Sequence, residues 1–381
     1  MKYKLSDICI GITDGSHNPP TGGGKSEFLM LSSKNVFDNQ ITFEEPRYLS
    51  KEQFAVEHKR TNITPGDVLM TIVGTVGRTA VVAESTPPIT LQRSVAVLHP
   101  KEDVCSSRYL MYLLRSKRAF FEAEAHGVAQ KGIYLKQLSD VRVDVPEIES
   151  QREIVQMLDK VQGVIQKRHS EVHALDDLIK ARFVEMFDLE NCKWGSFGED
   201  TDFVDYRGHT PELSDAGTIR MINAKSVGKG FFKYVEEYVT EEVYDSWMHR
   251  GFGYPGDVLF VTEGHTFGNT CLIPNELDKF ALGQRVITIK AHKEKLTNEF
   301  LCAYMQTDRF WRDINVYRTG GTAQGIRSKD LVKVKLPVTP IEDQKRFSAF
   351  VAQVDKSKFA VQKSLDETQT LFDSLMQKYF G

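Results

Sequence analysis

Two short polar segments near the start of the chain have the residue types of nucleotide- or base-binding loops. Gly24-Lys25-Ser26 matches the end of a phosphate-binding loop, but the first glycine that such a loop requires falls on Pro19. Asn18-Pro19-Pro20 matches part of a loop that holds a flipped base, yet Thr21 stands where an aromatic ring would stack on that base. We therefore expect both segments to be solvated loops.

The rest of the sequence contains no convincing motif for a metal site, a redox centre or a hydrolytic active site. His169 and His173 have the spacing of two metal ligands on one helix face, but Glu171 is not where a zinc-protease motif would place its acid. The five cysteines form no CxxC pair, which favours reduced thiols over a zinc site or a disulfide frame. No paired acidic cluster with a nearby lysine suggests a nuclease. The sequence predicts a chain without catalytic residues, metal or cofactor of its own.

The sequence consists of two halves that repeat one plan. Short motifs of the first half return in the second half at an offset of 190 to 194 positions. They are Pro65-Gly66-Asp67-Val68-Leu69 with Pro255-Gly256-Asp257-Val258-Leu259, Gln92-Arg93 with Gln284-Arg285, Ala129-Gln130 with Ala323-Gln324, and Glu149-Ser150-Gln151 with Glu342-Asp343-Gln344. Solenoid repeats are much shorter, about 20 to 50 residues. The offset therefore indicates duplicated domains, which suit a target that itself has two parts.

Composition is typical of a globular protein and gives no global signal for nucleic acid. The chain has 381 residues, of which 41% are hydrophobic and 27% charged, and its net charge is −3. No apolar run approaches the roughly 18 residues of a membrane span, and the N-terminus lacks the apolar core of a signal peptide. We expect a cytoplasmic protein whose DNA contacts, if any, come from local patches or from a partner with additional positive charge.

Each half combines a strand-rich region of about 145 residues with one long helical tail. Apolar runs at 68–73 and 258–262 follow Pro-Gly-Asp turns, and residues 95–98 and 286–289 are further candidate strands. Helical spacing of leucines, methionines and aromatics covers 108–124 and 299–315. The predicted class is α+β, with two tandem domains built on a mixed, twisted sheet or partial barrel with helices.

The two tails carry apolar residues at the seven-residue spacing of a coiled coil. Between Gln151 and Phe187 one seam is formed by Ile154, Val161, Arg168, Leu175 and Arg182 and the other by Leu158, Ile165, Val172, Ile179 and Met186. A shift of 193 positions reproduces both seams in the second tail. Two separate amphipathic helices are the alternative, but tails of equal length favour an antiparallel pair. The expected boundaries are 1–148 and 189–341 for the mixed domains, and 149–188 and 342–381 for the helices.

The junctions between mixed domains and tails carry a family resemblance. They are Gly127-Val-Ala-Gln130, Leu138, Val143-Asp-Val-Pro146 and Glu149-Ser-Gln151 in the first half, and Gly321-Thr-Ala-Gln324, Leu331, Leu336-Pro337 and Pro340-Ile-Glu-Asp-Gln344 in the second. With these motifs in register before each long helix, the whole chain resembles the DNA specificity subunit of type I restriction–modification systems.

The resemblance implies a role and a set of partners. Each of two target-recognition domains would read one half of a split, asymmetric sequence in double-stranded DNA, and the helices would act as a ruler that docks two adenine-N6 methyltransferase subunits. S-adenosylmethionine would bind that partner, and ATP and Mg²⁺ would bind a translocase–nuclease subunit if one joins. Two alternatives stay open: a specificity protein of a methylation-only defence complex, and a duplicated scaffold that binds protein.

The candidate DNA-binding residues are loop residues whose side chains suit base edges or phosphates. Glycines next to Thr75 and His265 would let the backbone approach DNA closely. In the first domain the candidates are Lys34, Asn35, Thr71, Thr75, Arg78, Gln92, Arg93 and Lys131. In the second domain they are Lys225, His265, Thr266, Asn269, Gln284, Arg285 and Arg327. For each residue, a surface charge or a fold-stabilising hydrogen bond is the competing interpretation.

Overall fold

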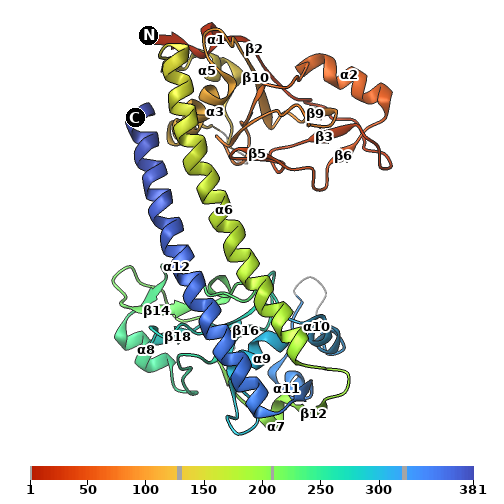
Figure 1. Ribbon diagram of the computed structural model, residues 1–381, viewed down its shortest axis with the longest axis vertical. Coiled ribbons are helices and arrows are strands. Elements are labelled where there is room, and N and C mark those ends of the chain that lie inside the picture. Colours follow the sequence, from red (N-terminus) through yellow and green to blue (C-terminus); the bar gives the residue numbers. More distant parts are fainter. Residues whose placement is uncertain (1, 127–130, 207–209, 320–323) are drawn as a thin grey trace. The chain divides into compact units, whose positions relative to one another are not determined.

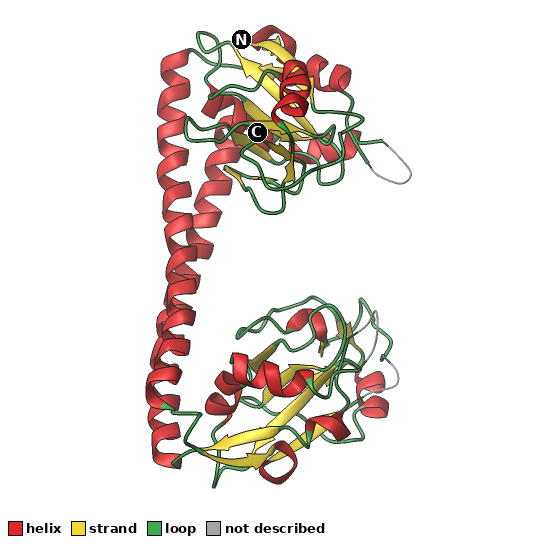
Figure 2. Ribbon diagram, turned by 90° about the vertical axis from the view of Figure 1, so that its right-hand side faces the viewer, coloured by secondary structure: helices red, strands yellow, loops and turns green. Residues whose placement is uncertain are grey.

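The computed structural model describes residues 2–126, 131–206, 210–319 and 324–381 and divides the chain into two compact units (Figure 1). Unit 1 contains Met1–Lys167 and Leu365–Gly381, and unit 2 contains Arg168–Ser364. Each unit therefore holds one mixed domain together with a segment of both long helices. Figure 2 shows that strands and helices are mixed within each unit.

The first mixed domain alternates short strands with short helices. Its elements are β1 (Lys2–Lys4), α1 (Leu5–Ile8), β2 (Cys9–Asp14), β3 (Leu29–Leu31), β4 (Val36–Phe37), β5 (Gln40–Ile41), β6 (Arg47–Tyr48), α2 (Lys51–Thr61), β7 (Val68–Thr71), β8 (Thr79–Val81), β9 (Ile89–Leu91), β10 (Val95–Pro100), α3 (Ser107–Ser116), α4 (Arg118–Glu124), α5 (Leu135–Asp140) and β11 (Arg142–Asp144).

The second mixed domain repeats this order, except that the 3-10 turn η1 takes the place of β4 and β5. Its elements are β12 (Lys193–Ser196), α7 (Phe197–Asp200), β13 (Thr201–Asp205), β14 (Ile219–Ile222), the 3-10 turn η1 (Ala224–Ser226), β15 (Tyr238–Val239), α8 (Glu241–Trp247), β16 (Val258–Val261), β17 (Thr270–Leu272), β18 (Phe280–Leu282), β19 (Val286–Ala291), α9 (Asn298–Tyr304), α10 (Asp308–Asn315), α11 (Ser328–Leu331) and β20 (Lys335–Val338).

Sheet topology confirms the duplication. A four-stranded antiparallel sheet has the order β2-β10-β7-β8 in the first domain and β13-β19-β16-β17 in the second. A three-stranded sheet follows, β6-β3-β9 and β15-β14-β18, with one parallel pair each (β3–β9 and β14–β18). The sheets stay open, so the α+β class with a mixed sheet is confirmed and no barrel closes among the described strands.

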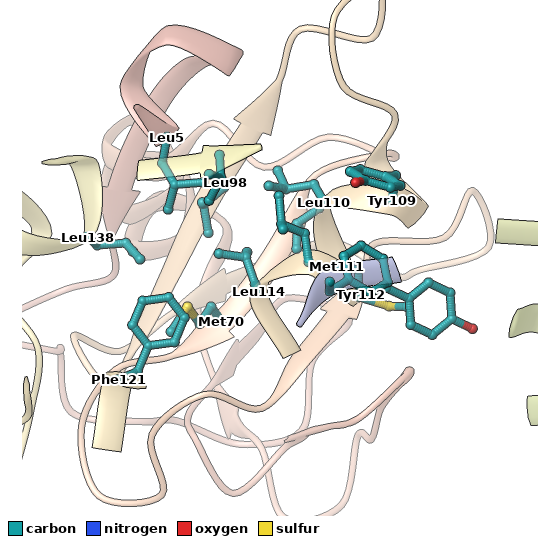
Figure 3. Packing of buried hydrophobic residues seen from close by; sticks show 14 of the residues in the cluster. Leu5, Met70, Leu98, Tyr109, Leu110, Met111, Tyr112, Leu114, Phe121 and Leu138 are labelled. Atoms are coloured by element: carbon teal, nitrogen blue, oxygen red, sulfur yellow. The ribbon is translucent and has the colours of Figure 1, made fainter. Parts of the chain in front are cut away.

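Alternation of side chains along the central strands explains the layered core. In β7, Val68 and Met70 face the cluster that contains helix α3, whereas Leu69 faces the cluster that contains β3 and β9. This is the period of two that a strand buried on both faces requires. Figure 3 shows Met70 and Leu98 of the sheet beside the aromatic and aliphatic side chains of α3.

The repeated Pro-Gly-Asp turns start the central strands because each residue has a structural task. Gly66 and Gly256 adopt positive φ angles of 93° and 83°, which favour glycine. The following aspartates are buried, and their carboxylates accept backbone N–H bonds from Thr64 at 2.6 Å and from Tyr254 at 3.0 Å. The motif thus closes the turn on itself.

The two segments that were expected to form one helix each, 108–124 and 299–315, form two consecutive helices each. The expected helix 108–124 is interrupted at Lys117 between α3 and α4, and 299–315 is interrupted between α9 and α10. Thr307 begins α10 by accepting a hydrogen bond from the Phe310 N–H at 3.2 Å, a capping geometry that periodicity of apolar residues does not reveal.

The tails form α6 (Ile148–Met186, 39 residues) and α12 (Ile341–Phe380, 40 residues). Their segments pack together in each unit: Met157 contacts Tyr379 in unit 1 (Sδ–Oη 3.5 Å), and the rings of Phe183 and Phe347 lie 5.6 Å apart in unit 2. In unit 1 the first part of α6 meets the last part of α12, whereas unit 2 shows the reverse. The predicted antiparallel pair is therefore confirmed.

A buried glutamine fastens each long helix to its own mixed domain. Gln151 accepts a hydrogen bond from the N–H of Ser106, the N-cap of α3, at 2.9 Å, and donates to the carbonyls of Val104 and Pro146 at 2.8 Å. Gln344 repeats this pattern with the Thr297 N–H at the start of α9. This shared geometry, which we call the glutamine clasp, explains why glutamine stands at the same place in both halves.

Candidate nucleic-acid interface

Four loops of the first mixed domain meet at one edge of its central sheet. The backbone N–H of Ile72 donates to the Ser94 carbonyl (2.9 Å), that of Ser33 to the Ser94 hydroxyl (3.0 Å), and that of Gly74 to the Lys131 carbonyl (3.1 Å). These bonds join residues 32–35, 72–78, 92–94 and 131–133, which we call the first loop cluster. Loops at one sheet edge can present several side chains to one ligand while strands hold them in place.

Within the first loop cluster, the candidate side chains divide into exposed and internal ones. Lys34, Thr75, Arg93 and Lys131 are exposed, and Gln92 is half-buried. The Arg78 guanidinium is also half-buried and lies 4.9 Å from the centre of the Phe37 ring, an arrangement that fixes a cation while leaving its edge available for hydrogen bonds.

Two candidates in this cluster build the loops instead of facing solvent. Thr71 is fully buried, and its hydroxyl accepts a hydrogen bond from the Arg78 N–H at 3.0 Å. Asn35 is 4% exposed; its amide oxygen accepts from the Ser32 N–H (3.1 Å) and its amide nitrogen donates to the Glu44 carbonyl (2.9 Å). Their polar groups are satisfied inside the protein.

The second mixed domain brings the corresponding segments together. The N–H of Thr262 donates to the Arg285 carbonyl (2.9 Å) and that of Gly264 to the Gln324 carbonyl (3.0 Å). The Thr266 hydroxyl and the Asn269 amide donate to carbonyls of residues 224 and 227 at 3.5 and 3.0 Å. Residues 224–227, 262–269, 283–285 and 324–327 form the second loop cluster.

The backbone frame of the two loop clusters is the same although their side chains differ. Gly74 and Gly264 have φ angles of 83° and 98°, and each lies beside an isolated bridge, Val73 to Gly132 and Glu263 to Gly325. The motifs that contain Ala129 and Ala323 lie outside the described residues. A constant frame with variable polar side chains is the arrangement that two different DNA half-sites would require.

Strand register corrects one of the sequence correspondences. Leu91 and Leu282 end the equivalent strands β9 and β18, and Val95 and Val286 begin the equivalent strands β10 and β19. Three residues separate these strands in each half, so Gln92-Arg93-Ser94 corresponds to Gly283-Gln284-Arg285. The pairing of Gln92-Arg93 with Gln284-Arg285 is therefore wrong by one position.

The two loop clusters differ in whether their lysine and arginine side chains have a carboxylate partner. Within the described part of the chain, no carboxylate lies within 4.0 Å of the Lys34, Arg93 or Lys131 side-chain nitrogens. In the second cluster Arg285 pairs with Glu263 at 3.2 Å, Arg327 with Asp330 at 3.3 Å, and Lys225 with Glu237. His265 is exposed and Gln284 is half-buried.

Sequence reasoning missed the acidic partners and Phe37. Glu263 lies two residues before the candidate His265, and the three-residue spacing of Arg327 and Asp330 could have indicated their pair. Lys225 and Glu237 are 12 residues apart, too far for a helical or turn spacing to indicate their pair. Among the described residues, no group of three or more His, Cys, Asp or Glu could hold a metal ion, and no helix has the length and apolar character to cross a membrane.

Comparison with known proteins identifies the family. The model of the type I restriction modification DNA specificity domain matches residues 21–173 and 201–368. The EcoBI specificity subunit of Escherichia coli is 30% identical over 156 residues, covering 40% of this chain and 31% of that protein. The MjaVIII specificity subunit of Methanocaldococcus jannaschii is 21% identical over 287 residues, covering 70% and 67%.

Solved structures support the same fold. The type I restriction–modification S subunit from M. genitalium aligns with a TM-score of 0.55 at 14% identity, covering 100% of this chain and 96% of that one. A chain from a structural study of type I complex assembly aligns with a TM-score of 0.51 at 16% identity, covering 100% and 97%. With two matching domain copies along most of its length, this chain belongs to the type I restriction–modification DNA specificity family.

Proposed function

We propose that this specificity subunit reads a bipartite, asymmetric DNA site, with one loop cluster on each half-site. The observation that carries the proposal is the pair of loop clusters, which share one backbone frame but carry different polar side chains. An identical frame supports the same approach to DNA, whereas different side chains support different base sequences.

The exposed and half-buried candidates of each cluster divide by their chemistry. Arg78, Arg93, Asn269 and Arg285 carry groups that suit base edges in the major groove. Lys34, Thr75, Lys131, Lys225 and Arg327 suit phosphates, and His265, Thr266, Gln92 and Gln284 complete the two surfaces. Thr71 and Asn35 support the first cluster from inside. The proposed recognition domains are residues 1–148 and 189–341.

Catalysis lies in partner subunits, because members of this family are non-catalytic specificity subunits. We propose that two copies of an adenine-N6 methyltransferase dock on the helical regions 149–188 and 342–381, since each half repeats the same helical segment beside the same fold. The partner would supply S-adenosylmethionine binding. A translocase–nuclease subunit with ATP and Mg²⁺ would distinguish a full restriction system from a methylation-only complex.

The helices also offer a physical means of fixing the gap between the half-sites. At a rise of 1.5 Å per residue, the 39 residues of α6 extend over roughly 58 Å. Half-sites read from one side of the duplex lie about 34–36 Å apart, or one helical turn. A rigid helical pair can hold two domains at such a separation, whereas a flexible linker would tolerate many spacings.

A gel-shift experiment tests the proposal against the scaffold alternative. The full chain, alone and with its methyltransferase, is mixed with labelled duplexes in the presence of excess non-specific competitor DNA. We expect a competitor-resistant shift on a subset of duplexes, strongest with the methyltransferase. Binding to no duplex under either condition, or equal binding to all of them, would refute sequence-specific recognition.

A further inference from the structure

A groove of about 1100 Å³ in unit 2 lies between helix α9, the long helices and the loop after η1. Its wall includes Glu299 and Ala303 of α9, Gln306 just after that helix, and Asp355 and Phe359 of α12. The side chains of Phe359 and Phe231 at this groove are 75% and 44% exposed. Exposed aromatics beside charged groups are typical of surfaces that bind another molecule.

The internal repeat shows what the same positions do in unit 1. Because Ser106 and Thr297 are the equivalent N-caps of α3 and α9, Glu299, Ala303 and Gln306 correspond to Arg108, Tyr112 and Arg115. The glutamine clasps align Ala352 with Asp159 and Asp355 with Gln162 in the same way.

In unit 1 these larger side chains occupy the space with contacts of their own. Arg108 pairs with Asp159, and the Tyr112 hydroxyl donates to the same carboxylate at 2.6 Å. Arg115 donates to Gln162 at 3.3 Å and lies 4.8 Å from the centre of the Phe372 ring. Two guanidinium groups of the chain itself therefore fill this region of unit 1.

At these three positions unit 2 has Glu299, Ala303 and Gln306. A carboxylate, an alanine and a neutral amide thus replace the two arginines and the tyrosine of unit 1. Glu299 accepts a hydrogen bond from Ser348 at 2.8 Å, and Asp355 replaces the neutral Gln162. Lys358 is 3.9 Å from Asp355 but only 2.6 Å from Asp176, its closer partner. Lys229 also lines the groove, yet among the described residues it lies within 4.0 Å of no carboxylate.

Lys358 pairs mainly with Asp176, and Lys180 pairs with Asp177. Among the described residues, Glu299 therefore has no cation within 4.0 Å and Asp355 has only the more distant Lys358 at 3.9 Å. Burial raises the pKa of Asp355, Lys358 lowers it, and the negative charges of Asp176 and Glu299 raise it further. A cation from outside the chain, placed between Glu299 and Asp355, would relieve the repulsion between these two carboxylates. These two acids beside the exposed ring of Phe359 suit a protein side chain that is both long and positively charged.

We propose that this groove receives an arginine- or lysine-bearing segment of the methyltransferase partner, so that the two docking positions on the chain are not equivalent. The inference rests on the proposed function and refines it: unit 1 fills the region with Arg108 and Arg115, whereas unit 2 takes the cation from its partner. The cation would lie between Glu299 and Asp355, with its apolar stem along Phe359.

The test transfers the unit 1 pair into unit 2. In the double variant Glu299→Arg with Ala352→Asp, the new side chains can pair as Arg108 and Asp159 do, which blocks the groove without leaving an unpaired charge. Asp355→Asn is the milder variant. Glu294→Arg, an exposed change of unit 2 outside the groove lining, is the control for charge. Urea unfolding of each chain alone verifies that it folds.

Native mass spectrometry and titration with the methyltransferase then measure stoichiometry and affinity. We expect the wild type and the control to bind two copies, whereas the double variant binds the second copy on the order of 100-fold more weakly. Asp355→Asn should weaken it less. Unchanged binding of two copies by both groove variants would overturn the inference alone; a wild type that binds no methyltransferase would overturn the proposed function as well.

A small cation is the competing occupant, and spermidine is the probe for it. If spermidine without methyltransferase raises the unfolding temperature of the wild type but not that of Asp355→Asn, the groove is a polyamine site and the inference is wrong. We expect no difference between the two chains.

Discussion

The glutamine clasp should contribute more to the stability of unit 2 than any single surface interaction. Gln344 is fully buried and makes three hydrogen bonds: it accepts from the Thr297 N–H at 2.9 Å and donates to the carbonyls of Lys295 and Thr339, both at 3.0 Å. Gln344→Ala leaves these three backbone groups without their partner. At about 1 kcal/mol for each hydrogen bond, we expect a loss of about 3 kcal/mol in the free energy of unfolding.

Gln344→Glu should cost at least as much although it is nearly isosteric. The carboxylate can still accept from the Thr297 N–H, but it cannot donate to the two carbonyls and instead places a negative charge against them. Glu342→Ala is the matched control on the same helical turn, because Glu342 is exposed and forms a surface ion pair with Lys345 (2.8 Å). That change should cost less than about 1 kcal/mol.

Urea unfolding of the full chain, followed by tryptophan fluorescence, is the appropriate assay. The three tryptophans, Trp194, Trp247 and Trp311, all lie in unit 2, so fluorescence reports on the unit that contains Gln344. The equivalent change Gln151→Ala should shift the circular-dichroism transition more than the fluorescence transition. If Gln344→Ala is no more destabilising than Glu342→Ala, the clasp does not hold the helix to the domain.

Three further predictions concern DNA reading, the spacer and pH. Arg93→Ala should relax the sequence preference at one half of the methylated site and Arg285→Ala at the other half. Loss of each bidentate contact with guanine should cost roughly 1–3 kcal/mol of discrimination against other bases. Methylation sequencing in which one variant loses the sequence preference of both halves would refute modular reading. Four-residue insertions after Ser170 and near Lys363 should lengthen the helical pair by roughly 6 Å. The spacer in the methylated DNA should then lengthen by one or two base pairs, with both half-site sequences unchanged. A folded variant that methylates at the original spacing would exclude the helices as the ruler. The hydrogen bond that His99 donates to the Asp67 carboxylate raises the pKa of His99 above its ordinary value of 6.5. The protonated ring should therefore stabilise unit 1 fully below pH 6.5 and lose this effect as pH rises through the raised pKa. His99→Gln should flatten this dependence in unfolding experiments, and an unchanged profile would contradict it.

Local patterns predicted the elements that depend on neighbouring residues. The Pro-Gly-Asp turns, the strands that follow them and the heptads of α6 and α12 are all specified within a few residues. The break between α9 and α10 was missed because apolar spacing continues across it, and only the cap at Thr307 reveals the new helix.

The sequence supplied candidate loop residues but not their arrangement in space. The structure brings the candidate loops of each domain to one edge of its central sheet, because they flank strands that pair in that sheet. Which side chains face outward depends on contacts that local patterns do not specify: Asn35 donates to the carbonyl of Glu44, nine residues away, and Lys225 pairs with Glu237, 12 residues away. The correspondence of Gln92 with Gly283 required strand register, since the offset between the halves changes along the chain.

Selection from random duplexes by the full chain together with its methyltransferase tests the central claim most directly. The chain and its partner are incubated with a randomised DNA library in excess competitor, and the bound duplexes are sequenced. Two loop clusters on a fixed helical spacer predict two short, different sequence blocks separated by a non-specific gap of constant length. A single continuous block, two identical blocks or no enriched sequence would contradict it.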